Sequence, residues 1–327
     1  DTININAIAA FDDSSSINGG AGNDNITGTS STVAFNASGD DGDDAIVGGS
    51  GGDTLNGNSG DDNITAANGN DNSTGGSGND TISGGIGTDT VTGGTGIDAL
   101  TSGAGDDLFI YNGTTDVGAA ETIDGEANND TILVQTGNTD FTNLGTATIL
   151  TAGNVERVQI TDTLQATFTG VQVTGQAINV NGTSTGVSRL NIDVTTNVAV
   201  DVSTLAFIAA GTGTAFATGT DIVDIDVADA LVGAVATTGT TLADSIDGGS
   251  GTDSLTGGTG NDTMDGSGGA DTIVGSAGGD SLTGGAASDD FKWSIGDGAA
   301  LNLATAAGFD QVSDFVTTAD EADVNND

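Results

Sequence analysis

Aspartate recurs at nine-residue intervals in two segments of this 327-residue chain, each time after a glycine-rich stretch. Residues 75–101, "GGSGNDTISGGIGTDTVTGGTGIDALT", contain three consecutive repeats of G-G-x-G-x-D-x-U-x, where U is a large apolar residue. Glycine allows positive φ angles and close backbone approach, so such a loop can direct its carbonyl oxygens toward one point. With the aspartate carboxylate, these oxygens form a hard ligand set. Such a set suits Ca²⁺ better than zinc or copper, and better than Mg²⁺, which requires a rigid octahedron.

The register of the repeats is regular in both segments. In the first segment, repeats begin at residues 39, 48, 57, 66, 75, 84, 93 and 102, and in the second at 239, 248, 257, 266, 275 and 284. One further repeat, "GGAGNDNIT", stands alone at 19–27, and a repeat-like stretch, "GEANNDTIL", follows out of register at 125–133. The repeat at 66 departs most from the pattern, because Ser73 replaces its apolar residue. Periodicity of this kind indicates a repeat architecture.

The repeats offer little cohesion apart from a bound cation. If each repeat divides into a loop, G-G-x-G-x-D, and a strand, x-U-x, only the U residue is expected to point inward. Burial of one apolar side chain does not offset the conformational entropy lost when nine residues become ordered. The chain also carries 47 acidic and 3 basic residues, a net charge of −44, and this self-repulsion opposes compaction. We therefore expect the metal-free arrays to be unfolded.

The repeats resemble those of the RTX nonapeptide family, which bind calcium. The resemblance implies a right-handed parallel β-roll with two repeats per turn, in which loops two repeats apart, such as those of Asp80 and Asp98, flank one ion. It also implies that the sixth-position aspartates are the Ca²⁺ ligands, although Asp71, Asp244 and Asp289 lie in repeats that depart from the pattern elsewhere. The predicted ligands are Asp24, Asp44, Asp53, Asp62, Asp71, Asp80, Asp89, Asp98, Asp107, Asp244, Asp253, Asp262, Asp271, Asp280 and Asp289.

We expect an all-β fold in which calcium-bound β-roll or β-solenoid arrays flank a β-rich middle domain. The middle segment alternates Val, Ile and Thr with polar residues, as in "SRLNIDVTTNVAVDVS", which predicts strands in either a continuing solenoid or a sandwich. Aromatic residues end both arrays, Phe109 and Tyr111 in the first and Phe291 and Trp293 in the second, and we expect them to cap the stacks. The predicted domains are an N-terminal β segment with one isolated repeat (1–38), a first array with its aromatic cap (39–133), the middle domain (134–238), a second array (239–292) and a C-terminal cap or tail (293–327).

Composition excludes several classes of function. The three basic residues, Arg157, Arg189 and Lys292, cannot neutralise a phosphate backbone, so we expect no nucleic-acid partner and no binding to bare anionic lipid. The chain has no His and no Cys, which removes His-ligated zinc, Ser-His-Asp triads and disulfides. No apolar run approaches the roughly 18 residues of a membrane span. The longest suggestive run is "TLAFIAA" at 204–210, so we expect no membrane insertion.

The same chemistry indicates where the protein works. Extracellular modules commonly bind Ca²⁺ with dissociation constants of about 10⁻⁴–10⁻³ M, so the arrays are expected to stay unfolded in calcium-poor cytoplasm and to fold outside the cell. The resemblance implies type I secretion through an uncleaved C-terminal signal, and the tail "FDQVSDFVTTADEADVNND", residues 309–327, resembles the region that follows RTX arrays. The chain opens on "DTININ", without Met or a cationic leader, and we expect it to be processed or a fragment.

RTX repeats occur in toxins, proteases, lipases, epimerases, adhesins and surface-layer proteins, so the motif alone does not give the function. We expect no enzyme. A metalloprotease needs His ligands and a lipase needs a His base, and the chain has no His. A glycosidase needs a pair of carboxylates, but nearly all acidic residues of the arrays belong to the repeats. Two arrays around a Thr- and Val-rich β domain resemble bacterial RTX surface-layer proteins, which form lattices or filaments on the cell surface. The expected partner is then the protein itself, with cell-surface polysaccharide as a further partner through a region that the sequence does not identify. The alternative is a segment of a large RTX adhesin or biofilm-matrix fibre secreted by a type I system.

Overall fold

The computed structural model describes residues 1–4, 16–144, 155–161, 164–173, 179–182, 189–194, 200–201, 206–207, 222–228, 233–292, 305–306 and 311–313. Two compact blocks divide the chain, an N-terminal block of residues 1–164 and a C-terminal block of residues 165–327. The predicted middle domain, 134–238, contributes residues to both blocks. Trp293, most of the C-terminal tail and the segment 208–221 lie outside the described residues.

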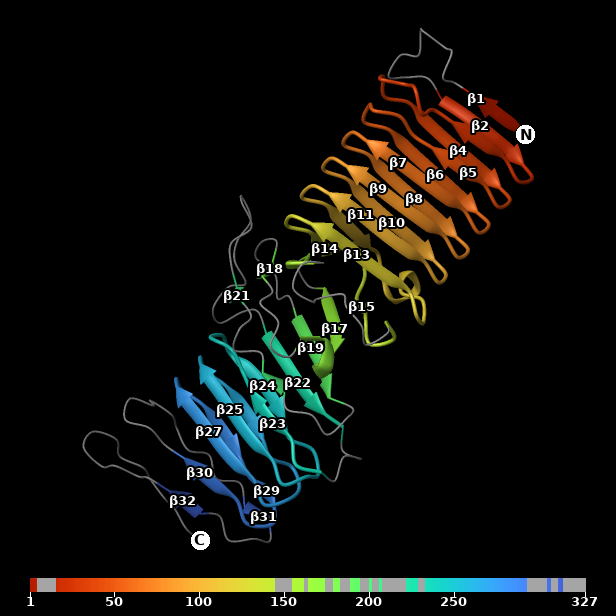
Figure 1. The fold of residues 1–327 in the computed structure, drawn as a ribbon. Coiled ribbons are helices and arrows are strands. Elements are labelled where there is room, and N and C mark those ends of the chain that lie inside the picture. Colours follow the sequence, from red (N-terminus) through yellow and green to blue (C-terminus); the bar gives the residue numbers. More distant parts are fainter. Residues whose placement is uncertain are drawn as a thin grey trace. The chain divides into compact units, whose positions relative to one another are not determined.

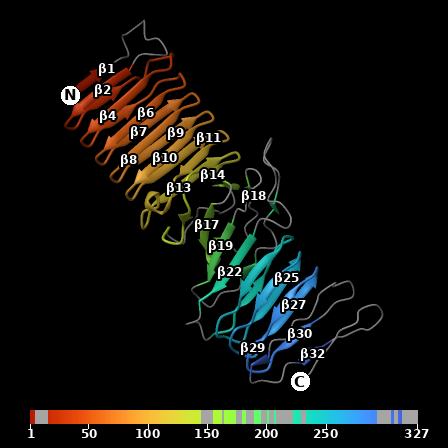
Figure 2. The same cartoon turned by 180° about the vertical axis from the view of Figure 1, so that it is seen from behind.

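The N-terminal block consists of two sheets whose neighbouring strands all pair in parallel (Figures 1 and 2). The first sheet contains, in spatial order, β1 (Thr2–Asn4), β3 (Asn25–Thr27), β5 (Ala45–Val47), β7 (Asn63–Asn68), β9 (Thr81–Ile86), β11 (Ala99–Ala104) and β13 (Thr122–Ala127). The second contains β2 (Ser16–Ala21), β4 (Asn36–Asp41), β6 (Thr54–Ser59), β8 (Asn72–Ser77), β10 (Thr90–Thr95), β12 (Leu108–Tyr111), β14 (Thr131–Val134) and β16 (Arg157–Ile160). A 3-10 turn at Thr114–Asp116 and the short strand β15 (Thr139–Asp140) complete the block. Successive repeats therefore alternate between the sheets, and two repeats make one turn of the stack.

The C-terminal block repeats this arrangement. One sheet contains β17 (Gln165–Thr169), β19 (Arg189–Val194), β22 (Ile222–Val227), β24 (Asp244–Asp247), β26 (Thr263–Asp265) and β28 (Ser281–Thr283). The other contains β20 (Val200–Asp201), β23 (Ala236–Thr238), β25 (Ser254–Thr259), β27 (Thr272–Ala277), β30 (Asp290–Lys292) and β32 (Gln311–Ser313). The remaining elements are the parallel pairs β18 (Asn179–Gly182) with β21 (Ala206–Phe207) and β29 (Gly285–Ala286) with β31 (Thr305–Ala306), and one helical turn, α1 (Gly170–Val173).

These pairings confirm the predicted all-β fold of stacked parallel arrays, and they decide the architecture of the described middle strands. In the C-terminal block, β19 pairs in parallel with β22, and β22 pairs in parallel with β24 of the second array. In the N-terminal block, β16 adds to β14 in the same way. The described middle strands therefore continue the solenoid and do not form a sandwich.

The strands of the arrays are longer than the predicted three residues. A full-length array strand such as β9, "TISGGI", runs through the first three residues of the next repeat, so the paired glycines lie in the strand. Its burial pattern shows two inward residues, Ile82 and Gly84. The expectation that only the apolar residue points inward was therefore wrong. Gly84 is needed because a Cβ there would lie 2.6 Å from the carbonyl oxygen of Ser102 and 2.8 Å from Oδ2 of Asp89.

The core between the two sheets of the N-terminal block is a column of single apolar side chains from consecutive turns. Ile26, Ile46, Ile64, Ile82, Leu100 and Ile123 come from the first sheet, and Leu55, Val91, Phe109, Ile132 and Val158 from the second, all 3% exposed or less. Phe109 and Tyr111 are buried within this column. The expectation that they cap the stack was wrong, because β12 pairs onward with β14. Tyr111 packs edge-on against Phe141, with ring centroids 5.0 Å apart.

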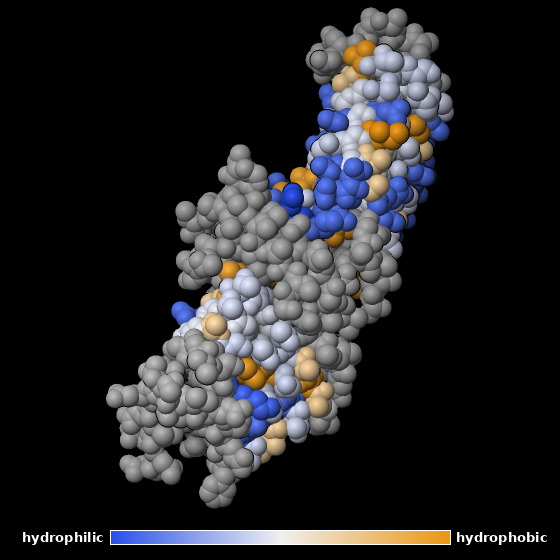
Figure 3. All heavy atoms as spheres, turned by 60° about the vertical axis from the view of Figure 1, so that its left-hand side comes forward, coloured by the Kyte–Doolittle hydropathy of each residue, from blue (hydrophilic) through white to orange (hydrophobic). Residues whose placement is uncertain are grey.

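The surface of the N-terminal block is largely hydrophilic. Figure 3 shows hydrophilic side chains over much of the described surface on one face, with smaller apolar areas between them. The exposed large apolar residues among those described are Val33, Ile86 and Ile97. No helix in the described part of the chain is long and apolar enough to cross a membrane.

One position in the core is poorly filled, and it generates a prediction. Ser73 lies between Leu55 and Val91 in strand register, is 1% exposed, and its hydroxyl has no hydrogen-bond partner. Replacing Ser73→Val removes a buried unsatisfied hydroxyl and adds apolar contact, which should raise the free energy of unfolding by about 1–2 kcal/mol. Urea denaturation in saturating Ca²⁺ measures the change. The control Ser77→Val places the same side chain at an exposed site, and an equal effect of both variants would contradict this account.

Candidate metal centre

All of the sixth-position aspartates predicted as ligands lie in the described residues, and each is buried to 4% exposure or less. Each follows a tight loop, for example Gly87-Thr88-Asp89, which joins a strand of one sheet to the next strand in the other. Such burial of one ionisable carboxylate per repeat requires compensation by hydrogen bonds and by opposite charge.

The first carboxylate oxygen is used to connect successive turns. Oδ1 of Asp98 accepts the backbone N–H of Asp80 at 2.8 Å, and Oδ1 of Asp80 accepts that of Asp62 at 2.8 Å. The loops two repeats apart therefore face each other, as the RTX resemblance implies. The "Asp24 ladder" contains Asp24, Asp44, Asp62, Asp80 and Asp98, and the "Asp53 ladder" contains Asp53, Asp71, Asp89, Asp107 and Asp130. The C-terminal block has two shorter ladders, Asp244–Asp262–Asp280 and Asp253–Asp271–Asp289.

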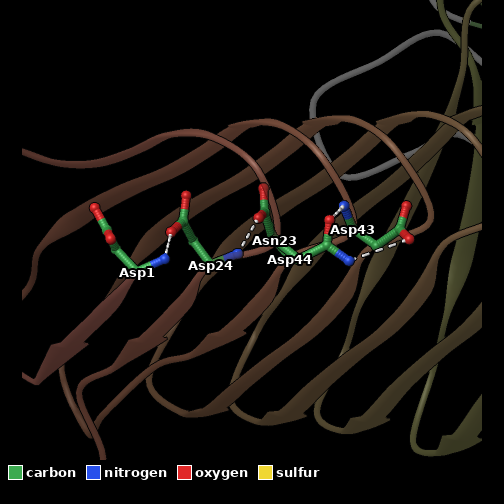
Figure 4. A network of polar contacts seen from close by, with 5 residues as sticks. All are labelled: Asp1, Asn23, Asp24, Asp43 and Asp44. Carbon is green, nitrogen blue, oxygen red and sulfur yellow. Dashed lines mark hydrogen bonds and ion pairs between the residues drawn. The ribbon is translucent and has the colours of Figure 1, made fainter.

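The N-terminal end of the Asp24 ladder is shown in Figure 4. The backbone N–H of Asp24 points at Asp44, and the ammonium group of Asp1 contacts the Asp24 carboxylate. Alongside, Asn23 and Asp43 contact each other through their side chains and backbone on the exposed side of the same loops.

The second carboxylate oxygen, Oδ2, is buried and accepts no hydrogen bond from the protein at most positions. This holds for Asp24, Asp44, Asp62, Asp71, Asp80, Asp89, Asp98, Asp107, Asp130, Asp253, Asp262 and Asp271. The protein also supplies almost no positive charge to them. The ion pairs among the described residues join Asp1 to Asp24, Arg189 to Asp224 and Lys292 to Asp290. A buried charged oxygen of this kind requires a cation.

The remaining ligands of such a cation must come from the backbone. Among the described residues, no group of three or more His, Cys, Asp or Glu side chains could hold a metal ion alone. The loop carbonyls are suitably placed, because they point along the stack into the next loop. A Cβ on Gly96 would lie 1.7 Å from the carbonyl oxygen of Gly78, and one on Gly87 would lie 1.4 Å from that of Gly69. Glycine thus leaves the space between loops lined by oxygen, and this donor set fits Ca²⁺.

Burial raises the pKa of ladder carboxyls in both blocks. The pKa rises to about 7 at Asp71, Asp80, Asp244 and Asp271, mainly by desolvation, with charge repulsion from neighbouring ladder carboxylates added. It rises to about 6 at Asp62, Asp89 and Asp262, and in the same direction at Asp44, Asp53, Asp98 and Asp253. The backbone N–H that each carboxylate accepts opposes the shift. In the metal-free loops these carboxyls therefore hold their protons at higher pH than a free aspartate does. A bound divalent cation would replace those protons as the compensating charge.

Two predicted ligands differ from the others in their hydrogen bonds. Oδ1 of Asp53 accepts the N–H of Phe35 at 3.1 Å, and Oδ2 accepts that of Gly49 at 2.8 Å. Both oxygens of Asp244 accept hydrogen bonds from Thr240, whose N–H lies 2.6 Å from Oδ2. These carboxylates stand at the beginning of their ladders and have fewer free lone pairs to offer a cation.

The structure adds residues that sequence reasoning missed. Asp130 and Glu156 extend the Asp53 ladder, and the repeat-like stretch at 125–133 was the signal for Asp130. Fifth-position side chains form a second, exposed ladder in the opposite direction. Oδ1 of Asp61 accepts the N–H of Asn79 at 2.7 Å, and Oδ1 of Asn79 accepts that of Ile97 at 2.9 Å. The frequent Asn and Asp at this position could have indicated it.

Comparison with protein-family models matches the RTX calcium-binding nonapeptide repeat (4 copies) at residues 11–31, 38–72, 65–100, 74–109, 83–117, 238–273 and 265–292. Comparison with curated proteins and with solved structures gave no match. The matched segments contain every predicted ligand. The two arrays are therefore RTX calcium-binding nonapeptide repeats. Repeats of this family bind multiple Ca²⁺ ions and are typical of secreted proteins.

The raised pKa values predict that acidification favours folding of the metal-free protein and opposes folding by Ca²⁺. A carboxyl whose folded pKa exceeds its unfolded value binds more protons when folded, so its contribution to stability falls as pH rises through the folded pKa. The metal-free protein should therefore gain β structure on acidification from about pH 8 to about pH 5. With Ca²⁺, protons compete for the same oxygens, and the Ca²⁺ concentration at half-folding should rise on acidification. Circular dichroism at several pH values checks both, and equal signs in the two titrations would contradict the ladder chemistry.

A ligand substitution tests the second oxygen directly. Asp80→Asn keeps the acceptor for the N–H of Asp62 and removes the charge beside Gly75. We expect a higher Ca²⁺ midpoint of folding and a loss of roughly 1–3 kcal/mol of stability in saturating Ca²⁺, about the contribution of one weak site. The control is Asp61→Asn, which removes one exposed carboxylate at a position where Asn occurs naturally. The same loss in both variants would mean that total charge, and not the ladder, controls folding.

Proposed function

We propose that this protein is a calcium-dependent extracellular structural protein, a subunit of a surface-layer lattice or filament that Ca²⁺ folds and assembles. The observation that carries the proposal is the row of buried Oδ2 atoms in both blocks that accept no hydrogen bond from the protein; among the described residues, only Asp24 in this row has a protein cation beside its carboxylate. Their number makes the fold depend on external Ca²⁺, because many weak sites act together. At ten times the dissociation constant each site contributes about 1.4 kcal/mol.

The exposed surface supports a second use of the same ion. In the N-terminal block, Asp41, Asp43, Asp61, Asp106 and Glu126 are exposed on the loop edges. Two copies of such a surface repel each other, and divalent cations shared between their carboxylates remove the repulsion. Folding and assembly would then respond to one trigger, which suits a protein that must remain soluble inside the cell and associate outside it.

The proposal places no catalysis in this chain. The side chains that general acid–base and nucleophilic chemistry use most often, His and Cys, do not occur. The single tyrosine, Tyr111, is 1% exposed and donates its hydroxyl to Glu121 at 2.5 Å, so it is not presented to a substrate. Most buried carboxylates hold the stack together through their Oδ1 atoms. These features favour a scaffold, and the bacterial RTX surface-layer proteins that the sequence resembles are scaffolds.

Electron microscopy tests this function. Negative-stain images of the purified chain in millimolar Ca²⁺ are expected to show ordered sheets or filaments, and excess chelator should dissolve them into monomers with reduced β signal. Sheets that persist in chelator would overturn calcium-mediated assembly. Isolated rods at all protein concentrations would instead favour the alternative, a segment of a larger RTX adhesin or matrix fibre.

A further inference from the structure

The Asp53 ladder does not end where the match to the repeat family ends. That match stops at residue 117 in the first array. Beyond it, Oδ1 of Asp130 accepts the N–H of Asp107 at 2.9 Å, and Oε2 of Glu156 accepts the N–H of Asp130 at 2.8 Å. Strand β14 continues the sheet in register above β12, with Thr131 opposite Leu108. The loop that carries Asp130 is therefore stacked on the loop of Asp107 in the way that array loops stack on each other.

Asp130 has the same unbalanced charge as the array aspartates. It is 0% exposed, and its Oδ2 is buried without a hydrogen-bond partner. No ion pair of the described residues includes it. Its environment is thus that of Asp89 or Asp107, although its sequence, "GEANND", lacks the glycines at the second and fourth positions of the repeat.

The backbone of this loop keeps the repeat conformation in spite of that loss. Glu126 has φ 64° and Asn128 has φ 92°, the left-handed region that Gly103 (φ 108°) and Gly105 (φ 152°) occupy in the preceding repeat. Side chains are disfavoured there, so the conformation persists only where the surroundings impose it. One backbone hydrogen bond beside Asn128 is also longer than its equivalent in the array. The hydrogen bond from Gly105 N–H to the carbonyl of Ala127 is 3.4 Å long, against 2.9 Å for the corresponding bond from Gly87 to Ala104.

The opposite edge of the stack ends differently. There Glu121 occupies the place that follows Asp98, since the N–H of Thr122 donates to the carbonyl of Asp98 as that of Thr131 does to Asp107. Both oxygens of Glu121 are used by the protein. Oε1 accepts the hydroxyl of Tyr111 at 2.5 Å, and Oε2 accepts the N–H of Gly118 at 2.9 Å. This carboxylate has partners for both oxygens without a cation.

We propose that a Ca²⁺ site lies between the loop of Asp107, which belongs to the recognised array, and the loop of Asp130 beyond it, with the Asp130 carboxylate as its charged ligand and loop carbonyls as the others. On the other edge, Tyr111 and Glu121 close the stack without a metal. The inference rests on the calcium-dependent fold proposed above. The wider spacing at Asn128 makes this site weaker than those of the arrays, so it fills last in a Ca²⁺ titration.

Native mass spectrometry and calorimetric Ca²⁺ titration of the full chain test the site. Asp130→Asn keeps the acceptor for Asp107 and removes the charge, so it should bind one ion fewer than the unaltered chain at saturation. Asp106→Asn is the matched control. It removes an exposed carboxylate from the facing loop, keeps an acceptor for the N–H of Asn129, and should leave the number of ions unchanged. An unchanged count in Asp130→Asn, with one ion lost in Asp80→Asn, would overturn this site and leave the proposed function intact. An unaltered chain that binds no Ca²⁺ would overturn the function itself.

A second variant decides the question if Asp130→Asn does not fold. Asn128→Gly restores the glycine of the repeat, relieves the left-handed φ and lets the loops close. It should lower the Ca²⁺ concentration at which the last ion binds by several-fold, while Asn129→Gly, one residue further on, should not. The same last binding step in Asn128→Gly and in the unaltered chain would contradict a site between these loops.

Discussion

The structure depends on the different roles of the two oxygens in most of the ladder carboxylates. One oxygen accepts the backbone N–H of the preceding turn and fixes the stacking of the loops, and the other lies against glycine with no protein partner. The first contact alone would bury an uncompensated negative charge at every loop, which proteins avoid by pairing the charge or binding a metal. A protein cation cannot take that role in a chain with three basic residues. Stacking and cation binding therefore depend on the same side chain, one through each of its two carboxylate oxygens.

The sequence predicted the parts of the fold that periodicity controls. The nine-residue spacing predicted a repeat architecture, and the RTX resemblance implied a parallel stack with two repeats per turn and sixth-position aspartates such as Asp80 as ligands. It did not give the inward-facing first glycine, because a residue without a side chain carries no burial signal. Asp130 and Glu156 were missed because ladder membership is set by three-dimensional register, and inserted residues shift the spacing in the chain without shifting the stack.

The two side-chain ladders make neighbouring turns depend on each other in both directions. A sixth-position carboxylate satisfies the N–H of the turn before it, as Asp98 does for Asp80, while a fifth-position side chain satisfies the turn after it, as Asp61 does for Asn79. A single turn in isolation thus lacks partners on both sides. Such nearest-neighbour coupling is the condition under which a linear array folds cooperatively over several repeats. It also explains why one poor layer, at Ser73, is tolerated inside an otherwise regular stack.

The ladder hydrogen bonds keep nearly the same length whatever the number of residues between the two aspartates that they join. Regular turns connect aspartates 18 residues apart, yet Asp24 and Asp44 are 20 apart and Asp107 and Asp130 are 23 apart, with N–H to oxygen distances of 2.8 and 2.9 Å. The additional residues form loops at the edge of the stack, and the chain rejoins the stack before the next ladder carboxylate. The edge is consequently a place where foreign peptides can be inserted at chosen positions along the stack, and Ca²⁺ would control whether the stack that carries them is folded.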